Sequence, residues 1–129
     1  MFVSATKKAR GASLISAIFL ITALASLGAL MSKLTIFSTR TTLQDYYAAQ
    51  AFAAANSGLE WAGWCIETKA NSSDCDNVTV AVASSSCHIA VTNFTLDNLT
   101  IFVITSEGRA GEGGFGASRL LEAHYIKPP

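Results

Sequence analysis

The chain has few of the residues that build metal centres or interrupt helices. Its 129 residues include two histidines, three cysteines and two prolines. There is no Cys-x-x-Cys motif, so a zinc site is not expected. No proline lies between Ser32 and Lys69, so nothing in that stretch forces a helix to end.

Charge is absent from a long stretch near the N-terminus. Residues 12–31, ASLISAIFLITALASLGALM, contain no charged side chain, and Lys7, Lys8 and Arg10 stand just before them. At about 1.5 Å per residue, a helix of this length covers about 30 Å, the thickness of a bilayer's hydrocarbon core. The sequence therefore predicts one membrane-spanning helix, with a cytoplasmic N-terminus by the positive-inside rule.

The border between the basic residues and the apolar run has the form of a cleavage site. A secretory signal is cut behind a shorter apolar core, but here the suitable small residue is Gly11, in front of the run. A cut there leaves the apolar helix on the mature chain, with six basic and nine acidic residues. That chain has no basic patch, so nucleic acid is not an expected partner.

Beyond the apolar run the pattern becomes that of an amphipathic helix. Alanine, the best helix former, is abundant, and one helix is predicted from about Ser13 to about Thr68. Gly58 and Gly63 mark places where a bend or close packing is expected. At least one of Trp61 and Trp64 is expected to pack against the rest of the fold. The apolar residues that recur at helical spacing are Ala48, Phe52, Ala55, Leu59, Ala62 and Ile66.

After a loop at residues 71–74 the hydrophobic period changes to two. Runs at residues 78–82, 89–92, 99–105 and 119–126 predict about four antiparallel strands. Residues 84–86 and 97–98 read as hairpin connectors, and residues 108–116, GRAGEGGFG, as a long glycine-rich loop. The predicted fold class is α+β, with the amphipathic half of one long helix packed on a small antiparallel sheet.

Three cysteines permit one disulfide and leave one thiol. In the topology above they lie beyond the membrane, where disulfides form. Cys65 and Cys75 close a short local loop, so this pairing is slightly favoured over Cys75–Cys87 and Cys65–Cys87.

Residues with catalytic chemistry are scattered along the chain. His88, His124, the serines at 84–86 and Cys87 show no spacing that provides a nucleophile with an oriented base. The glycine-rich stretch lacks the Gly-Lys-Ser/Thr of a phosphate loop. The sequence therefore predicts no enzyme, no cofactor and no metal site.

A basic leader ending in glycine, a long apolar helix, its amphipathic continuation and a small β-head resemble a type IV pilin-like protein. The segments SAIFLITALASLGA and YYAAQAFAAANSGLEWA, and later SEGRAG and SRLLEAHY, are similar to minor pilins of the MshP and PilX type, MshP belonging to the MSHA pilus system. The chain then divides into a leader (1–11), a transmembrane or filament-core half (12–34), an amphipathic half (35–69) and a β-head (70–129).

The resemblance implies a structural subunit that helps to initiate or cap a type IV (MSHA-like) pilus or pseudopilus. It implies that prepilin peptidase cuts between Gly11 and Ala12 and methylates Ala12. The helix would hold the subunit in the bacterial inner membrane, with a periplasmic head, and contact major and minor pilins and the assembly platform. Ala12 departs from the usual phenylalanine. Ser16 departs from the usual glutamate, which points to a place at the pilus tip.

The sequence also supports an alternative hypothesis about the class of protein. Asn71, Asn77, Asn93 and Asn98 each begin an Asn-x-Ser/Thr triplet. In a eukaryotic exported protein these are glycosylation acceptors. The alternative is therefore a single-pass type II membrane glycoprotein with an uncleaved signal anchor.

Overall fold

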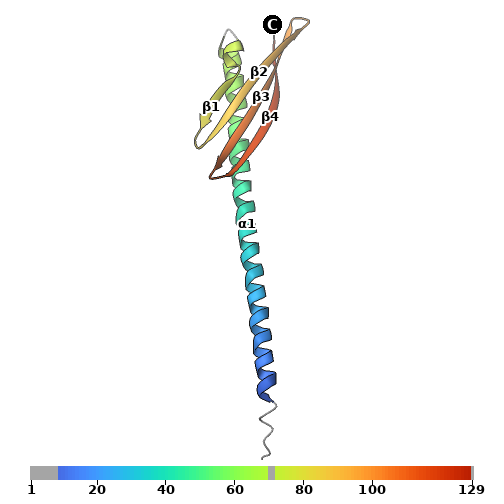
Figure 1. Cartoon of the computed structure of the whole chain (residues 1–129). Coiled ribbons are helices and arrows are strands. Elements are labelled where there is room, and N and C mark those ends of the chain that lie inside the picture. The colour runs from blue at the N-terminus through green and yellow to red at the C-terminus, as the bar shows by residue number, and fades with distance from the viewer. Residues whose placement is uncertain (1–8, 70–71, 129) are drawn as a thin grey trace, which may run out of the picture. The chain divides into compact units, whose positions relative to one another are not determined.

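The computed structural model describes residues 9–69 and 72–128. It contains one long helix followed by a four-stranded antiparallel sheet, so the predicted α+β fold is confirmed (Figure 1). The elements are α1 (Ala9–Thr68), the short 3-10 helix η1 (Ser72–Cys75), β1 (Val78–Val82), β2 (Ser85–Leu96), β3 (Leu99–Glu112) and β4 (Phe115–Lys127). Residues 1–8 of the predicted leader lie outside the described residues.

The chain separates into two compact units, Met1–Thr41 and Thr42–Pro129. The described part of the first unit is helical throughout. The second unit contains the C-terminal part of α1, η1 and the sheet. We call residues 12–31 the apolar half of α1 and residues 42–68 the packed half.

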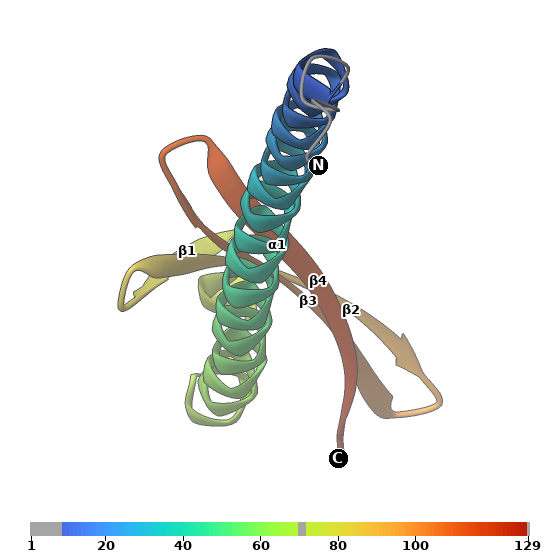
Figure 2. The same ribbon diagram turned by 90° about the horizontal axis from the view of Figure 1, so that it is seen from below.

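The sheet is built from consecutive hairpins in the order β1-β2-β3-β4. Each connection has two residues, and each contains backbone in the left-handed region that suits the twist of a hairpin. Figure 2 shows the strands crossing α1 at an angle. The positive φ angles are 53° at Ala83, 47° and 70° at Asp97 and Asn98, and 62° and 85° at Gly113 and Gly114.

Two of the predicted connections were too long. Ser85 and Ser86 belong to β2, and the expected glycine-rich loop at 108–116 is mostly strand, since β3 continues to Glu112 and β4 starts at Phe115. Only Gly113 and Gly114 form the turn. A high glycine content predicts a flexible loop, but Gly108 and Gly111 lie in β3 at points where two backbones approach closely.

The clearest close approach is at Gly108, where β3 passes under α1. A Cβ atom there would collide with the carbonyl oxygen of Ala51 and lie 2.6 Å from the backbone nitrogen of Ala55. On the helix side, a Cβ at Gly58 would collide with Ser106 Oγ and lie 3.0 Å from Cys87 Sγ. Helix and sheet therefore meet through small residues, and the predicted close packing at Gly58 is confirmed.

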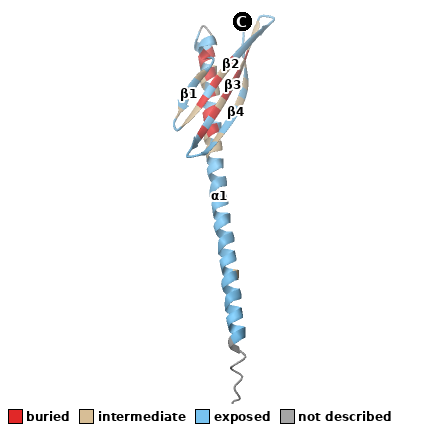
Figure 3. Cartoon of the chain, in the orientation of Figure 1, coloured by how far each residue is buried: buried red, intermediate tan, exposed pale blue. Residues whose placement is uncertain are grey.

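The core forms between the packed half of α1 and one face of the sheet (Figure 3). The predicted helix face is rotated slightly from the observed one, because Phe52 is 53% exposed while Ala51 is fully buried. Trp61 packs against the core, as expected of one tryptophan, and Trp64 is exposed. The main buried residues are Ala54, Ala62, Cys65, Ile66, Cys75, Cys87, Ile89, Val91, Phe102 and Ile104.

Candidate functional site

The apolar half of α1 has no partner within the described residues. Its large side chains are exposed, with Phe19 at 74% and Ile21 at 66%. Among the residues described, α1 is the one helix long and apolar enough to cross a membrane. An apolar surface of this extent is stable only in lipid or against other apolar helices. The molecule therefore has a helix suited to membrane association.

Three hydroxyl groups in this half are hydrogen-bonded within the helix. Ser16 Oγ donates to the carbonyl of Ala12 at 2.8 Å, Thr22 Oγ1 to that of Ile18 at 3.0 Å, and Ser26 Oγ to that of Ala23 at 2.8 Å. Such bonds remove the cost of placing a hydroxyl in hydrocarbon. The predicted cleavage point, Gly11–Ala12, lies within α1 in this uncleaved chain.

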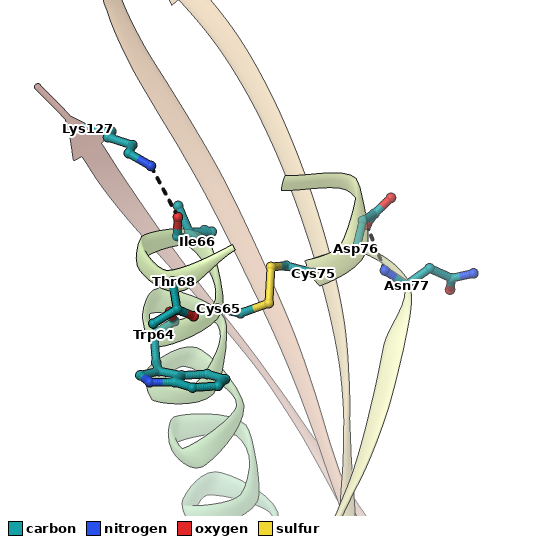
Figure 4. The surroundings of a disulfide bond; sticks show 8 residues. All are labelled: Trp64, Cys65, Ile66, Thr68, Cys75, Asp76, Asn77 and Lys127. Carbon is teal, nitrogen blue, oxygen red and sulfur yellow. Dashed lines mark hydrogen bonds between the residues drawn. A yellow bond between two sulfur atoms is a disulfide. The ribbon is translucent and has the colours of Figure 1, made fainter. Parts of the chain in front are cut away.

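A disulfide closes the C-terminal end of α1. Cys65 bonds to Cys75 of η1, with Cα atoms 6.0 Å apart, so the favoured pairing is the one present (Figure 4). Cys87 is free and buried. Burial raises the pKa of its thiol, and a backbone hydrogen bond with Val80 partly offsets that rise. Cys87 Sγ also lies 3.6 Å from the carbonyl oxygen of Val80. Cys87 is therefore a packing residue with little thiolate at neutral pH.

Side chains of β4 hold the same end of the helix. Tyr125 donates its hydroxyl to Glu67 Oε1 at 2.7 Å, and the bond raises the pKa of Tyr125. Lys127 Nζ donates to the carbonyl of Ile66 at 3.4 Å, one of the carbonyls left open where a helix ends (Figure 4). The disulfide and these two contacts bind the last turn of α1 to both η1 and the sheet.

The histidines lie on exposed strand positions. His88 Nδ1 is 3.1 Å from Thr79 Oγ1, and His124 Nε2 is 2.9 Å from Glu122 Oε1. Neither has a hydrogen bond to a serine or cysteine in the part of the chain that is described. Arg109 forms a two-point ion pair with Glu107, at 2.9 and 3.0 Å, which lowers the pKa of Glu107. In residues 9–69 and 72–128, no group of three potential metal ligands comes together.

The sheet face turned away from α1 has an apolar region that sequence reasoning did not identify. Phe94 pairs with Ile101, and Ile101 pairs with Ile126, so the three side chains form one row across β2, β3 and β4. Phe94 is 52%, Ile126 54% and the nearby Leu96 63% exposed. We call these four residues the outer apolar patch. Strand alternation in residues 92–101 was the signal that would have revealed it.

Comparison with protein-family models, with curated proteins and with solved structures found no match for this chain.

Proposed function

We propose that this protein is a membrane-anchored structural subunit of the type IV pilin class, a minor pilin of the MshP or PilX kind that helps to initiate or cap a pilus or pseudopilus. The observation that carries the proposal is the change of character along α1. Its apolar half is exposed on all sides, while one face of its packed half lies under a four-stranded antiparallel sheet. In a subunit of this construction, one half of α1 serves the membrane or filament core and the other half serves the subunit's own head.

The pilin class predicts processing at Gly11. The basic leader, the small residue and the apolar helix behind it are what prepilin peptidase requires in the family that this chain resembles. Gly11 has open space around it in the structure, so Gly11→Leu leaves the fold intact while blocking cleavage. Intact mass of protein from membranes is the test: wild type loses residues 1–11 and gains a methyl group on Ala12, and the variant keeps the leader.

The matched control is Gly28→Leu, which also meets open space and lies outside the leader. It is expected to be cleaved like wild type. If the mass of wild-type protein still includes residues 1–11 in cells with an active peptidase, the pilin proposal is wrong.

Ser16 supports a place at the tip of the filament. In pilin filaments, glutamate at this position neutralises the N-terminal amine of the subunit already in place, because an unpaired charge at bilayer depth is costly. Here the Ser16 hydroxyl is bonded to Ala12 and brings no charge. A subunit without the carboxylate cannot accommodate an amine above it, so it is expected to enter first.

Immunogold labelling of sheared filaments tests this placement. Label is expected at filament ends only. Label spread evenly along the shafts would exclude the tip, and normal piliation in a deletion strain without label would exclude an initiator as well.

The glycoprotein alternative rests on a specific observation. Asn77, Asn93 and Asn98 are exposed and could be reached by a glycosyltransferase; Asn71 lies outside the described residues. The same intact-mass measurement separates the two classes, because the alternative predicts a retained leader together with added sugar mass.

A further inference from the structure

Strand β2 has a free edge over its second half. Its pairing with β1 stops at Ile89, opposite Val78, whereas its pairing with β3 continues to Leu96. In the described part of the sheet, residues 92–96 therefore have a neighbouring strand on one side only.

The direction of the free backbone groups follows from one hydrogen bond. The N–H of Val91 points away from β3 and donates to Asp76 Oδ1 at 2.8 Å. Because backbone groups alternate along a strand, the N–H and C=O groups of Asn93 and Thr95 also point away from β3. Asp76 thus completes the edge at Val91, and the next two outward-facing residues offer two donors and two acceptors to a further strand.

Within the part of the chain that the structure describes, residues 92–96 of this edge lack the features that protect such strands from pairing. Residues 91–96, VTNFTL, contain no charge and no proline, and lysine, proline or a covering loop are the usual protections. Phe94 and Leu96 place exposed apolar side chains beside the open backbone. A strand laid along this edge would cover apolar surface on one face while its main chain is paired.

Carboxylates stand at both ends of the free edge. Asp76 lies beside Val91, and Asp97 begins the turn that follows Leu96. Neither takes part in an ion pair among the described residues. An incoming segment therefore meets an uncharged centre flanked by negative charge.

We infer that the free edge of β2 at Asn93–Thr95 binds an extended segment of another protein, with alternate apolar residues between basic ends, by strand addition. A second copy joined edge to edge is disfavoured. In an antiparallel pair of two copies, the Asp97 end of one edge would lie near the Asp76 end of the other, and this would bring like charges together. The contact goes beyond the proposed function, since it depends on the sheet alone.

The test uses the full chain in lipid nanodiscs and a fluorescein-labelled peptide, Lys-Thr-Val-Thr-Val-Thr-Lys, followed by anisotropy. Saturable binding is expected. Asn93→Pro removes one outward donor at a strand edge, where proline is tolerated. Loss of this one hydrogen bond to the peptide is expected to weaken binding about fivefold. The matched control Asn93→Ala keeps the N–H and is expected to bind like wild type.

Two further measurements separate strand addition from non-specific adhesion. The same peptide N-methylated along its backbone keeps its apolar side chains but cannot pair, so it is expected not to bind. Asp97→Asn is expected to weaken binding about twofold, because one exposed charge contact is lost. Unfolding curves of Asn93→Pro and wild type establish that both are folded.

Equal binding by Asn93→Pro and wild type, binding of the N-methylated peptide, or no binding by wild type would each overturn the inference. A wild-type dimer that Asn93→Pro abolishes would replace the foreign strand with a second copy. None of these outcomes bears on cleavage after Gly11, so failure here is distinguishable from failure of the pilin proposal.

Discussion

The two halves of α1 belong to one continuous helix, but they differ in which side chains are buried and which are exposed. The apolar half carries large side chains all round, such as Phe19 and Ile21, and exposes them. The packed half buries small residues, including Ala51, Ala54 and Ala55, against the sheet. The apolar half of α1 is stable only in an apolar environment such as lipid. The packed half is stabilised by its close contact with the strands of the sheet.

This difference explains why alanine and glycine occupy the positions where α1 passes closest to β3. A large side chain toward the sheet would hold the backbones apart, and Gly58 and Gly108 show how little space remains. In lipid, a large apolar side chain meets a yielding environment and adds transfer free energy. Substitutions of the same kind should therefore have opposite consequences in the two halves.

The largest expected effect is that of a charge in the apolar half. Ile21→Lys lies near the middle of the span and should make membrane insertion less favourable by about 3 to 4 kcal/mol. Carbonate extraction of membranes is the measurement, with the variant shifting from the pellet to the supernatant. The control Ala49→Lys, on an exposed position of the packed half, should leave the distribution unchanged. Retention of Ile21→Lys in the pellet would mean that this helix does not anchor the protein.

Loss of the disulfide should have the next largest effect, confined to the packed half. Cys65 and Cys75 are 10 residues apart, and replacing both by alanine should lower the free energy of unfolding by about 3 kcal/mol. Guanidinium unfolding followed by tryptophan fluorescence measures it. Dithiothreitol should move the wild-type curve to that of the variant and leave the variant unaffected; an unchanged wild-type curve would contradict the prediction.

Gly108→Ala tests the close approach directly. The added Cβ collides with the backbone of α1 at Ala51, which cannot move as a side chain can. The free energy of unfolding should fall by about 2 kcal/mol. The same unfolding assay measures it, and membrane extraction should be unchanged. A variant as stable as wild type would show that helix and sheet separate easily at this point.

Gly63→Ala should give the smallest effect, in the opposite direction. A Cβ at this helical glycine meets nothing within 4 Å, so alanine's better helix propensity should raise the free energy of unfolding by about 1 kcal/mol. Gly58→Ala is the matched comparison in the same helix, because its Cβ meets Ser106 and Cys87. If both variants were stabilised alike, packing at Gly58 would not be limiting.

Local pattern was sufficient for the elements of this fold. The helix ends at Thr68, as predicted from alanine content and the absence of proline, and begins at Ala9, earlier than the expected Ser13. The run at 78–82 is β1, and Asp97-Asn98 is a two-residue turn. The favoured cysteine pairing also followed from a local feature, the short loop between Cys65 and Cys75.

Features that depend on a distant neighbour were predicted less well. The glycine content of residues 108–116 predicts a loop, but these residues are mostly strand. Glycine is frequent both in turns and in strands that pass close to a helix, so composition alone does not distinguish the two. Helical spacing and hydrophobicity predict that Phe52 is buried, but Phe52 is exposed and the neighbouring small residue Ala51 is buried instead. The free edge of β2 depends on where β1 stops, and nothing in the sequence of β2 itself shows this.

The sequence by itself therefore determined the uncharged span, the helix, the strand periods and the α+β class, because these depend on residues near one another along the chain. Only the tertiary structure decided which helix face is buried, why Gly58 and Gly108 are glycine, and which edge and apolar face of the sheet stay open. The buried helix face and the glycines follow from the close approach of distant segments, such as Ala51 and Gly108, where van der Waals contact selects residues by size as well as by hydrophobicity. The open edge follows from the point at which β1 stops pairing with β2.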